Sequence, residues 1–242
     1  MICHMTKTAR LIEILSVLLV ILLVPCGLKA QSIPLDSIEG LQPHNVEIKP
    51  VVYEGRKSVQ VVPTAEADSA AAARPGGGGG GIVVLPKITF HNGTIELDVA
   101  GKPRADAPGD ARGFVGLAFR VSADASKYEC VYIRPTNGRA DDQLRRNHST
   151  QYCSSPDYEW LRLRTESPGK YESYVDLVPG QWTKLRIEVS GLTMKLYVNG
   201  ASQPALIVSD LKMGDSRGGV ALWIGLGTEA YFANLRVTER IQ

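Results

Sequence analysis

The chain has 242 residues, of which 44% are hydrophobic, and its 27 basic residues nearly balance its 25 acidic residues. A formal net charge of +2 gives no argument for a nucleic-acid partner or for an anionic membrane surface. The N-terminal segment has the pattern of an export signal. Without it, roughly 210 residues remain, which is enough for one β-sandwich with a sizeable core.

The N-terminal segment, residues 1–30, predicts a cleaved secretory signal. Lys7 and Arg10 precede an apolar run over 11–28, and Ala30 is the small residue expected before a cleavage site. The run is too short to cross a bilayer comfortably. We therefore expect a secreted, periplasmic or cell-surface protein with no transmembrane segment in the mature chain. Lipidation of Cys26 is the alternative, although a preceding proline suits it poorly.

Residues 31–242 are interpreted as a single domain with one interruption. Small and polar residues fill 65–73, and Arg74-Pro75 and six glycines follow. Such a composition buries little surface, so a flexible Ala/Gly-rich loop is expected at 64–81.

Alternation of apolar and polar residues predicts β-strands through the rest of the domain. The clearest case is a hairpin of residues 183–189 and 193–198, followed by the turn pair Asn199-Gly200. The expected strands are 46–49, 59–62, 82–85, 94–99, 114–121, 128–134, 171–177, 183–189, 193–198, 205–211, 220–224 and 231–237. About a dozen short strands with Gly, Pro and Asn turns predict an all-β, two-sheet antiparallel sandwich of jelly-roll type.

Several of these segments resemble motifs of concanavalin A-like lectin and glucanase sandwiches. They are Phe90–Val99, Gly180–Leu185, the Leu-Tyr-Val-Asn-Gly run at 196–200, and the closing segments 218–225 and 231–237. The sequence is most similar to laminin G-like and 3-keto-disaccharide-hydrolase-like domains of secreted bacterial proteins, over roughly 40–240. This resemblance implies the fold and a glycan ligand on a concave sheet. It also implies a structural calcium ion as an option, and no other cofactor is expected.

Strand alternation places four residues on one outer sheet face. Arg120, Tyr132, Arg134 and Trp223 all alternate with core-facing apolar residues. Aromatic rings can pack on the C–H faces of sugars, and guanidinium groups donate in fixed directions. These four residues are predicted to form the floor of a glycan site. The alternative is that they are a second packing layer, covered by the long loop that follows.

That loop, residues 136–170, is the longest segment expected to be irregular, and long ordered loops are often functional. Asn137, Arg139, Arg145 and His148 are predicted to form a polar wall beside the floor. The alternative is a solvated loop held by its own ion pairs. Asp141/Arg145 and Asp142/Arg146 are spaced for a local helical turn.

Enzymatic alternatives have weaker support. Glu96 and Asp98 begin like the Glu-x-Asp-x-x-Glu signature of laminarinase-like hydrolases, but Gly101 stands in place of the last carboxylate. A glycoside hydrolase or lyase of the 3-keto-disaccharide-hydrolase-like type would have to use other acids. The candidates are Glu129, Asp141, Asp142 and Glu172. No His/Cys spacing typical of a zinc site occurs.

Two cysteines, Cys130 and Cys153, remain after signal cleavage. In an oxidising compartment this pair predicts a disulfide, and the alternative is two unbridged thiols. The sequence thus leaves three functional hypotheses. The first is a secreted domain that binds a polysaccharide or glycoconjugate, the second is a hydrolase acting on glycosidic bonds, and the third is a purely adhesive or structural surface domain.

Overall fold

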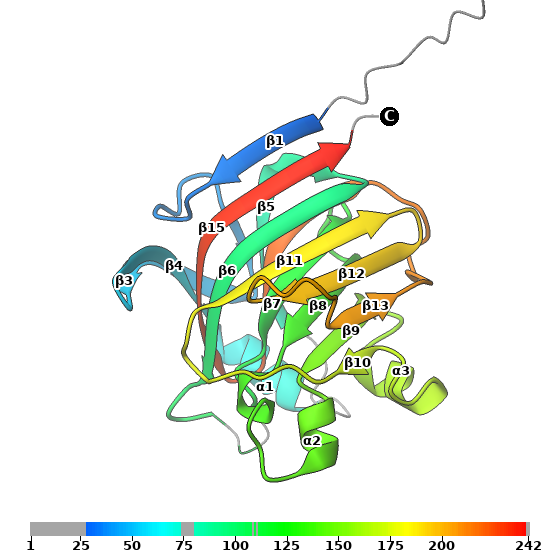
Figure 1. Ribbon diagram of the computed structural model, residues 1–242. Helices are drawn as coiled ribbons and strands as arrows, with labels where there is room; N and C mark the ends of the chain where they lie inside the picture. Colours follow the sequence, from blue (N-terminus) through cyan, green and yellow to red (C-terminus); the bar gives the residue numbers. More distant parts are fainter. Residues whose placement is uncertain (1–27, 74–79, 108, 110, 241–242) are drawn as a thin grey trace, which may run out of the picture.

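The computed structural model of the protein describes residues 28–73, 80–107, 109 and 111–240. The predicted signal up to residue 27, including Cys26, lies outside the described residues, as do Arg74–Gly79. Within the described part, the strands form two antiparallel sheets that pack face to face (Figure 1). The predicted all-β two-layer sandwich is confirmed.

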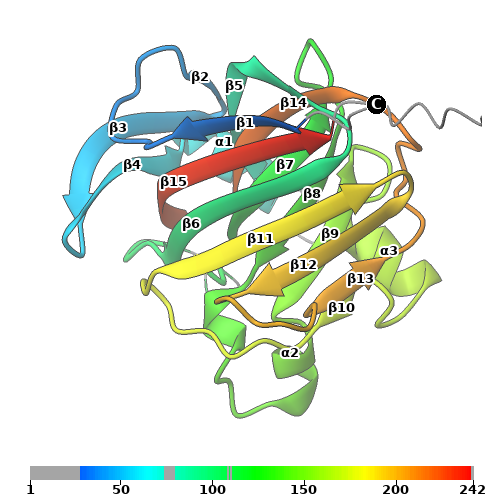
Figure 2. The same cartoon turned by 45° about the horizontal axis from the view of Figure 1, so that its top comes forward.

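Sheet A has eight strands in the described chain, in the order β13-β12-β11-β6-β15-β4-β3, and β1 also pairs with β15. Its strands are β1 (Leu28–Ile33), β3 (Val46–Tyr53), β4 (Arg56–Pro63), β6 (Gly93–Pro103), β11 (Thr183–Ser190), β12 (Thr193–Val198), β13 (Leu206–Val208) and β15 (Thr228–Arg240). The long β15 pairs with β6 along most of its length, and β4 and β1 pair with its two halves on the other side (Figure 2).

Sheet B has seven strands among the described residues, in the order β10-β9-β8-β7-β14-β5-β2. They are β2 (Gln42–His44), β5 (Gly80–Phe90), β7 (Val115–Val121), β8 (Tyr128–Ile133), β9 (Thr150–Ser155), β10 (Glu172–Ser173) and β14 (Gly218–Gly225). One face of sheet B packs on sheet A. The other face, called the outer face of sheet B below, carries most of the predicted site.

The core between the sheets follows the alternation read from the sequence. In β11, Leu185, Ile187 and Val189 are buried, whereas the intervening side chains are partly or fully exposed. Leu185 pairs with Val198 and Ile187 with Leu196, so the predicted hairpin is confirmed. Burying one apolar face of each sheet removes the largest apolar area from water and sets the sandwich architecture.

The predicted loop at 64–81 is not irregular where the structure describes it. Residues Ala65–Ala72 form helix α1, and Gly80 and Gly81 begin β5. Thr64 caps the helix because its hydroxyl accepts a hydrogen bond from the Ala67 N–H at 3.2 Å. Alanine has the highest helix propensity, and two acidic residues in the first turn favour the helix dipole. Thr64, the acidic first turn and the alanines therefore indicate a helix, although the small and polar composition of the segment led to the prediction of a loop.

The segment 136–170 is also more regular than expected. It contains a 3₁₀ turn (Pro135–Asn137), α2 (Gln143–Asn147), β9 and α3 (Trp160–Glu166). The predicted helical turn exists as α2, but Asp142 stabilises it mainly as the N-cap, accepting from the Arg145 N–H at 2.7 Å. At the other end of the domain, Leu28–Ala30 pair with β15 as part of β1, although the sequence assigned them to the signal.

One glycine positions the centre of the outer face of sheet B. Gly116 in β7 lies between Trp223 of β14 and Tyr132 of β8 in the strand register. Two strand spacings separate these residues by about 9.5 Å, yet their ring centroids lie only 4.4 Å apart. Both rings therefore lean over the glycine, which has no side chain to hold them apart. A Cβ atom at Gly116 would also lie 2.2 Å from the Val131 carbonyl oxygen.

We therefore expect Gly116→Ala to lower the free energy of unfolding by about 1–3 kcal/mol, because the added carbon overpacks the sheet. Gly109→Ala is a matched control, since a Cβ atom at Gly109 meets no atom within 4 Å. Urea unfolding followed by tryptophan fluorescence measures both effects. Equal midpoints for the two variants would contradict this account of Gly116.

Candidate functional site

The aromatic floor of the outer face of sheet B consists of Tyr132, Trp223 and Phe114. The Tyr132 and Trp223 rings stack with an interplanar angle of 19°, and Phe114 lies edge-on to Tyr132 at 6.2 Å. Tyr132 and Trp223 are only 3% and 5% exposed. The structure thus brings the two predicted floor aromatics together, but as a covered layer. Within this structure they support the surface and are not themselves available to stack on a sugar.

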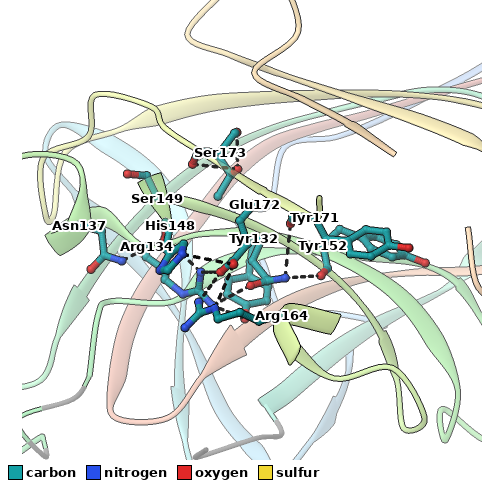
Figure 3. A network of polar contacts seen from close by, with 12 residues as sticks. Tyr132, Arg134, Asn137, His148, Ser149, Tyr152, Arg164, Tyr171, Glu172 and Ser173 are labelled. Atoms are coloured by element: carbon teal, nitrogen blue, oxygen red, sulfur yellow. Dashed lines mark hydrogen bonds and ion pairs between the residues drawn. The ribbon is translucent and has the colours of Figure 1, made fainter. Parts of the chain in front are cut away.

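Arg134 joins this floor to the neighbouring strands. Its guanidinium lies 5.2 Å from the Tyr132 ring centroid and donates to the Tyr132 hydroxyl at 3.2 Å and to Gln151 Oε1 at 3.0 Å. It also donates to the His148 carbonyl at 3.0 Å and to Glu172 Oε1 at 3.2 Å. Figure 3 shows Tyr132, His148 and Glu172 around this guanidinium. With so many bonds and 5% exposure, Arg134 acts as an internal cross-link.

Glu172, at the start of β10, is the carboxylate of this cluster, and its side chain is 2% exposed. Besides Arg134, it pairs with Arg164 of α3, whose Nε lies 3.0 Å from Glu172 Oε2. His148 Nε2 lies 3.5 Å from the same oxygen. Two guanidinium groups and an imidazole around one carboxylate satisfy its acceptor capacity, which is what a buried charge requires.

The exposed edge of the cluster is formed by Arg164, His148 and Trp160, which we call the rim. The side chains of Arg164 and His148 are 31% and 17% exposed, and Trp160 is half-buried. The Arg164 guanidinium lies 4.5 Å from the Trp160 ring centroid and that of Arg134 lies 5.9 Å from it. Burial lowers the pKa of His148, opposed by Glu172, so the ring is neutral at neutral pH and can donate or accept one hydrogen bond.

The predicted loop wall is only partly assembled. Asn137 is buried, donates to the His148 carbonyl at 3.0 Å, and accepts from Arg145 Nε at 3.0 Å. These two residues therefore hold His148 in place. Arg139 lies apart, exposed and paired with Asp176 at 2.7 Å.

Arg120 does not belong to the floor, and this prediction is wrong. It is the extra residue of a β-bulge between β7 and β14, with φ of 55°, so the simple alternation ends there. Its fully buried guanidinium donates to the carbonyl oxygens of Gly191, at 2.8 Å, and of Gly214. Arg120 thus ties turns of sheet A to β7 and does not face the outer surface.

Glu129 lies on the opposite face of sheet B from Glu172. It shares the face of Val131 and accepts hydrogen bonds from the Tyr152 hydroxyl and from the Met213 N–H, the latter at 2.7 Å. Burial raises the pKa of this carboxyl, partly offset by its hydrogen bond from Tyr152. Glu129 is completely inaccessible and serves the packing of the 211–217 loop.

The four proposed catalytic acids are therefore not assembled. Asp141 and Asp142 are exposed in the α2 segment, with Asp142 serving as the helix cap. Glu129 and Glu172 project from opposite faces of one sheet, whereas retaining glycosidases place two carboxyl groups about 5–5.5 Å apart. Of the four, only Glu172 joins the outer-face cluster.

Sequence reasoning missed Arg164 and Gln151. Gln151 was missed because the sequence predicted a loop where β9 lies. The residues of β9 are mostly polar and find partners on both faces of the strand, so they show no apolar alternation. Arg164 could have been found from its spacing: it follows Trp160 by four residues, which places both on one face of a helix.

Cys130 and Cys153 are opposite each other across β8 and β9, and both are free, buried thiols. The predicted disulfide is not formed in this structure. Burial raises the pKa of the Cys130 thiol well above its ordinary value. For Cys153, the hydrogen bond from Cys130 lowers the pKa and burial raises it, with a net increase.

Among residues 28–73, 80–107, 109 and 111–240, no three His, Cys, Asp or Glu side chains gather in a way that would hold a metal ion. In the same part of the chain, no helix is long and apolar enough to span a membrane.

Comparison with known proteins identifies the fold. No protein-family model and no curated protein matches the sequence. Among solved structures, the carbohydrate-binding module CBM66 from Bacillus subtilis matches with a TM-score of 0.54 and 16% identity, covering 83% of this chain and 95% of that one. A Bacillus subtilis protein of unknown function with a galectin-like fold matches with a TM-score of 0.56 and 11% identity, covering 87% and 94%.

A protein from Parabacteroides distasonis, named as a candidate glycosyl hydrolase, matches with a TM-score of 0.52 and 12% identity, covering 87% of this chain and all of that one. Identities this low show the fold alone. The chain is a concanavalin A-like β-sandwich, as the sequence motifs implied.

The thiol pair gives a direct prediction. Because the thiolate is the reactive form, raised pKa values and burial should protect Cys130 and Cys153 from iodoacetamide at pH 8 in the folded protein. Both should be alkylated after unfolding in guanidinium without reductant, as measured by peptide mass spectrometry. Recovery of a peptide pair linked through Cys130 and Cys153 would contradict the free thiols.

Glu129 gives a second prediction, in which pH is the variable. A folded-state pKa above the unfolded value stabilises the protein at low pH, and this contribution is lost as pH rises through the folded pKa. The stability of wild type relative to Glu129→Gln should therefore fall as pH is raised from 4 to 7, measured by urea unfolding. Exposed Glu47 provides the control variant Glu47→Gln. A difference that stays constant or grows with pH would contradict the raised pKa.

Proposed function

We propose that this protein is a secreted, lectin-like domain that binds a polysaccharide or glycoconjugate at the rim of the outer face of sheet B. Arg164, His148 and Trp160 would contact the sugar. The buried residues Tyr132, Arg134 and Trp223 would hold that surface rigid from below, and Asn137 and Arg145 would fix His148.

The observation that carries the proposal is the contrast in exposure within one connected cluster. Arg134 and Glu172 are buried, whereas the Arg164 and His148 side chains, held by the same carboxylate, reach solvent. A guanidinium, a neutral imidazole and an indole offer directed hydrogen bonds beside an aromatic surface, which suits a ring with hydroxyl edges and C–H faces. Preorganisation by the buried bonds lowers the entropy lost on binding.

The names of structurally similar proteins support the same class of ligand. One is a carbohydrate-binding module, and another similar structure is the VIP36 exoplasmic/lumenal domain in a Ca²⁺/Man3GlcNAc-bound form, with a TM-score of 0.51. The export signal expected from the sequence would bring the protein to a compartment where such glycans occur. No cofactor is part of this proposal.

Glycoside hydrolysis is the second candidate, since one similar structure is named for it. Glu172 is the acid that this reaction would use. Its carboxylate is already paired with two guanidinium groups, and no second proposed carboxylate joins it. Binding without cleavage is therefore the better-supported function.

A glycan array tests the binding site. We expect Arg164→Gln to weaken binding to the glycans that wild type retains by about tenfold or more, because both the charge and the directed donors are lost. Arg139→Gln is the matched control, since Arg139 is an exposed arginine outside the cluster. Thermal unfolding of both variants separates lost contact from lost fold.

Three outcomes would count against the proposal. Equal binding by wild type and a folded Arg164→Gln protein would remove the rim as the site. Release of soluble sugars from bound glycans by wild type, but not by Glu172→Gln, would favour the hydrolase. Absence of any glycan ligand across plant, fungal, bacterial and N-linked glycans would favour an adhesive or structural role.

A further inference from the structure

A cavity of about 280 Å³ lies at the other end of sheet B, between α1 and the adjoining ends of β5 and β14. Its helix wall is formed by Ala67, Ala70 and Ala71, and its sheet wall by Gly80, Gly81 and Gly225. It is separate from the rim, because β10 and β14 stand four strand spacings apart, or about 19 Å.

Small residues line both walls of this space. Gly80 and Gly81 cannot be replaced without displacing neighbours, since added Cβ atoms would lie 2.8 Å from the Trp223 ring and 2.0 Å from Val46 Cγ1. The strand wall is thus bare backbone. Opposite it, α1 presents methyl groups where any larger side chain would fill the cavity.

The position of α1 is fixed by Asp68. Its Oδ1 accepts from the Gly227 N–H at 2.9 Å, and Arg104 Nη1 lies 2.8 Å from its Oδ2. These contacts link the helix to the end of β15 and to the segment after β6. The cavity is therefore held open by a bonded frame in the folded protein.

The lining of the cavity has an apolar part and a polar part. Alanine methyl groups, Pro63 and Leu226 provide apolar surface, and Asn45 and Glu66 add exposed polar side chains at the edge. Arg104 neutralises Asp68, so Glu66 leaves the cavity with negative charge. Binding pockets for drug-sized ligands usually measure about 300–1,000 Å³, so this one suits a smaller molecule.

We infer that this cavity is a second binding site, for a single neutral monosaccharide ring. The C–H face of the ring packs on the methyl-lined wall, and its hydroxyl groups donate to Asn45 and Glu66. The negative edge disfavours anionic sugars. The site is independent of the rim and does not depend on the glycan-binding proposal above.

Isothermal titration calorimetry with D-glucose, D-galactose, D-mannose and D-glucuronate tests the inference on the full chain. At least one neutral hexose should bind saturably to wild type, and Ala67→Leu, which fills the cavity, should weaken that binding by about tenfold or more. Ala72→Leu is the matched control: it adds the same side chain to the exposed face of α1 and should leave the affinity within about twofold. If Ala67→Leu fails to fold, Ala70→Leu fills the same cavity from a more exposed position.

Several results would overturn the second site. One is that none of the three hexoses binds saturably. A second is that the folded cavity-filling variant binds the hexose with unchanged affinity, and a third is that Ala72→Leu loses as much affinity as that variant. A fourth is that D-glucuronate binds as tightly as the hexoses. Arg164→Gln should bind the hexose normally, so failure of the rim proposal and failure of this inference are distinguishable. Loss of hexose binding in Arg164→Gln alone would assign the monosaccharide to the rim instead.

Discussion

The buried pairing of Arg134 with Glu172 is the interaction on which the outer face of sheet B depends. Removing two charges from water is costly, and their attraction repays that cost only when the remaining donors and acceptors are also satisfied. Here Arg134 bonds to residues on β8, on β9 and before β9, and Glu172 bonds to α3. An unpaired buried charge would be strongly destabilising. Helix α3, edge strand β10 and the segment carrying His148 must therefore be positioned so that all of these bonds form together.

A second buried charge system acts on the opposite side of the same sheet. Arg120 and Glu129 face sheet A and its turns, where backbone carbonyls accept from the terminal nitrogens of Arg120 and the Met213 N–H donates to Glu129. The Arg120 Nε has no hydrogen-bond partner among the residues that the structure describes. The bulge at Arg120 makes this possible, since an extra residue redirects a side chain that strict alternation would send outward. Sheet B therefore carries ionic cross-links on both faces. Those on the inner face order loops of the sandwich, and those on the outer face support a surface that reaches solvent.

Alternation predicted faces well wherever a strand was regular and one of its faces was apolar. It placed Tyr132 and Arg134, at the end of β8, on the same face as Trp223 of β14. It failed at Arg120, because a bulge leaves no mark on the apolar pattern Val-Gly-Leu-Ala-Phe-Arg-Val. It failed at β9, where Thr150–Ser155 has polar partners on both faces and no apolar run. The burial of outer-face residues could not be predicted either. Alternation assigns a polar residue to the outer face, but it does not show whether a helix covers that face.

Coverage of the aromatic floor changes where a ligand can bind. Rings that stack on each other have already used the faces that a sugar would contact, so recognition must move outward to side chains that the floor holds in place. The two proposed sites, the rim and the α1 cavity, both lie away from these rings. The rim would bind through half-exposed polar groups, and the cavity would bind through walls lined by small residues. Both depend on residues that never touch the ligand: Arg134 and Glu172 position the rim, and Asp68 with Arg104 positions the helix. Specificity in this sandwich would therefore change most readily by exchanging exposed residues of α1 and α3, since the sheet beneath them leaves little freedom for substitution.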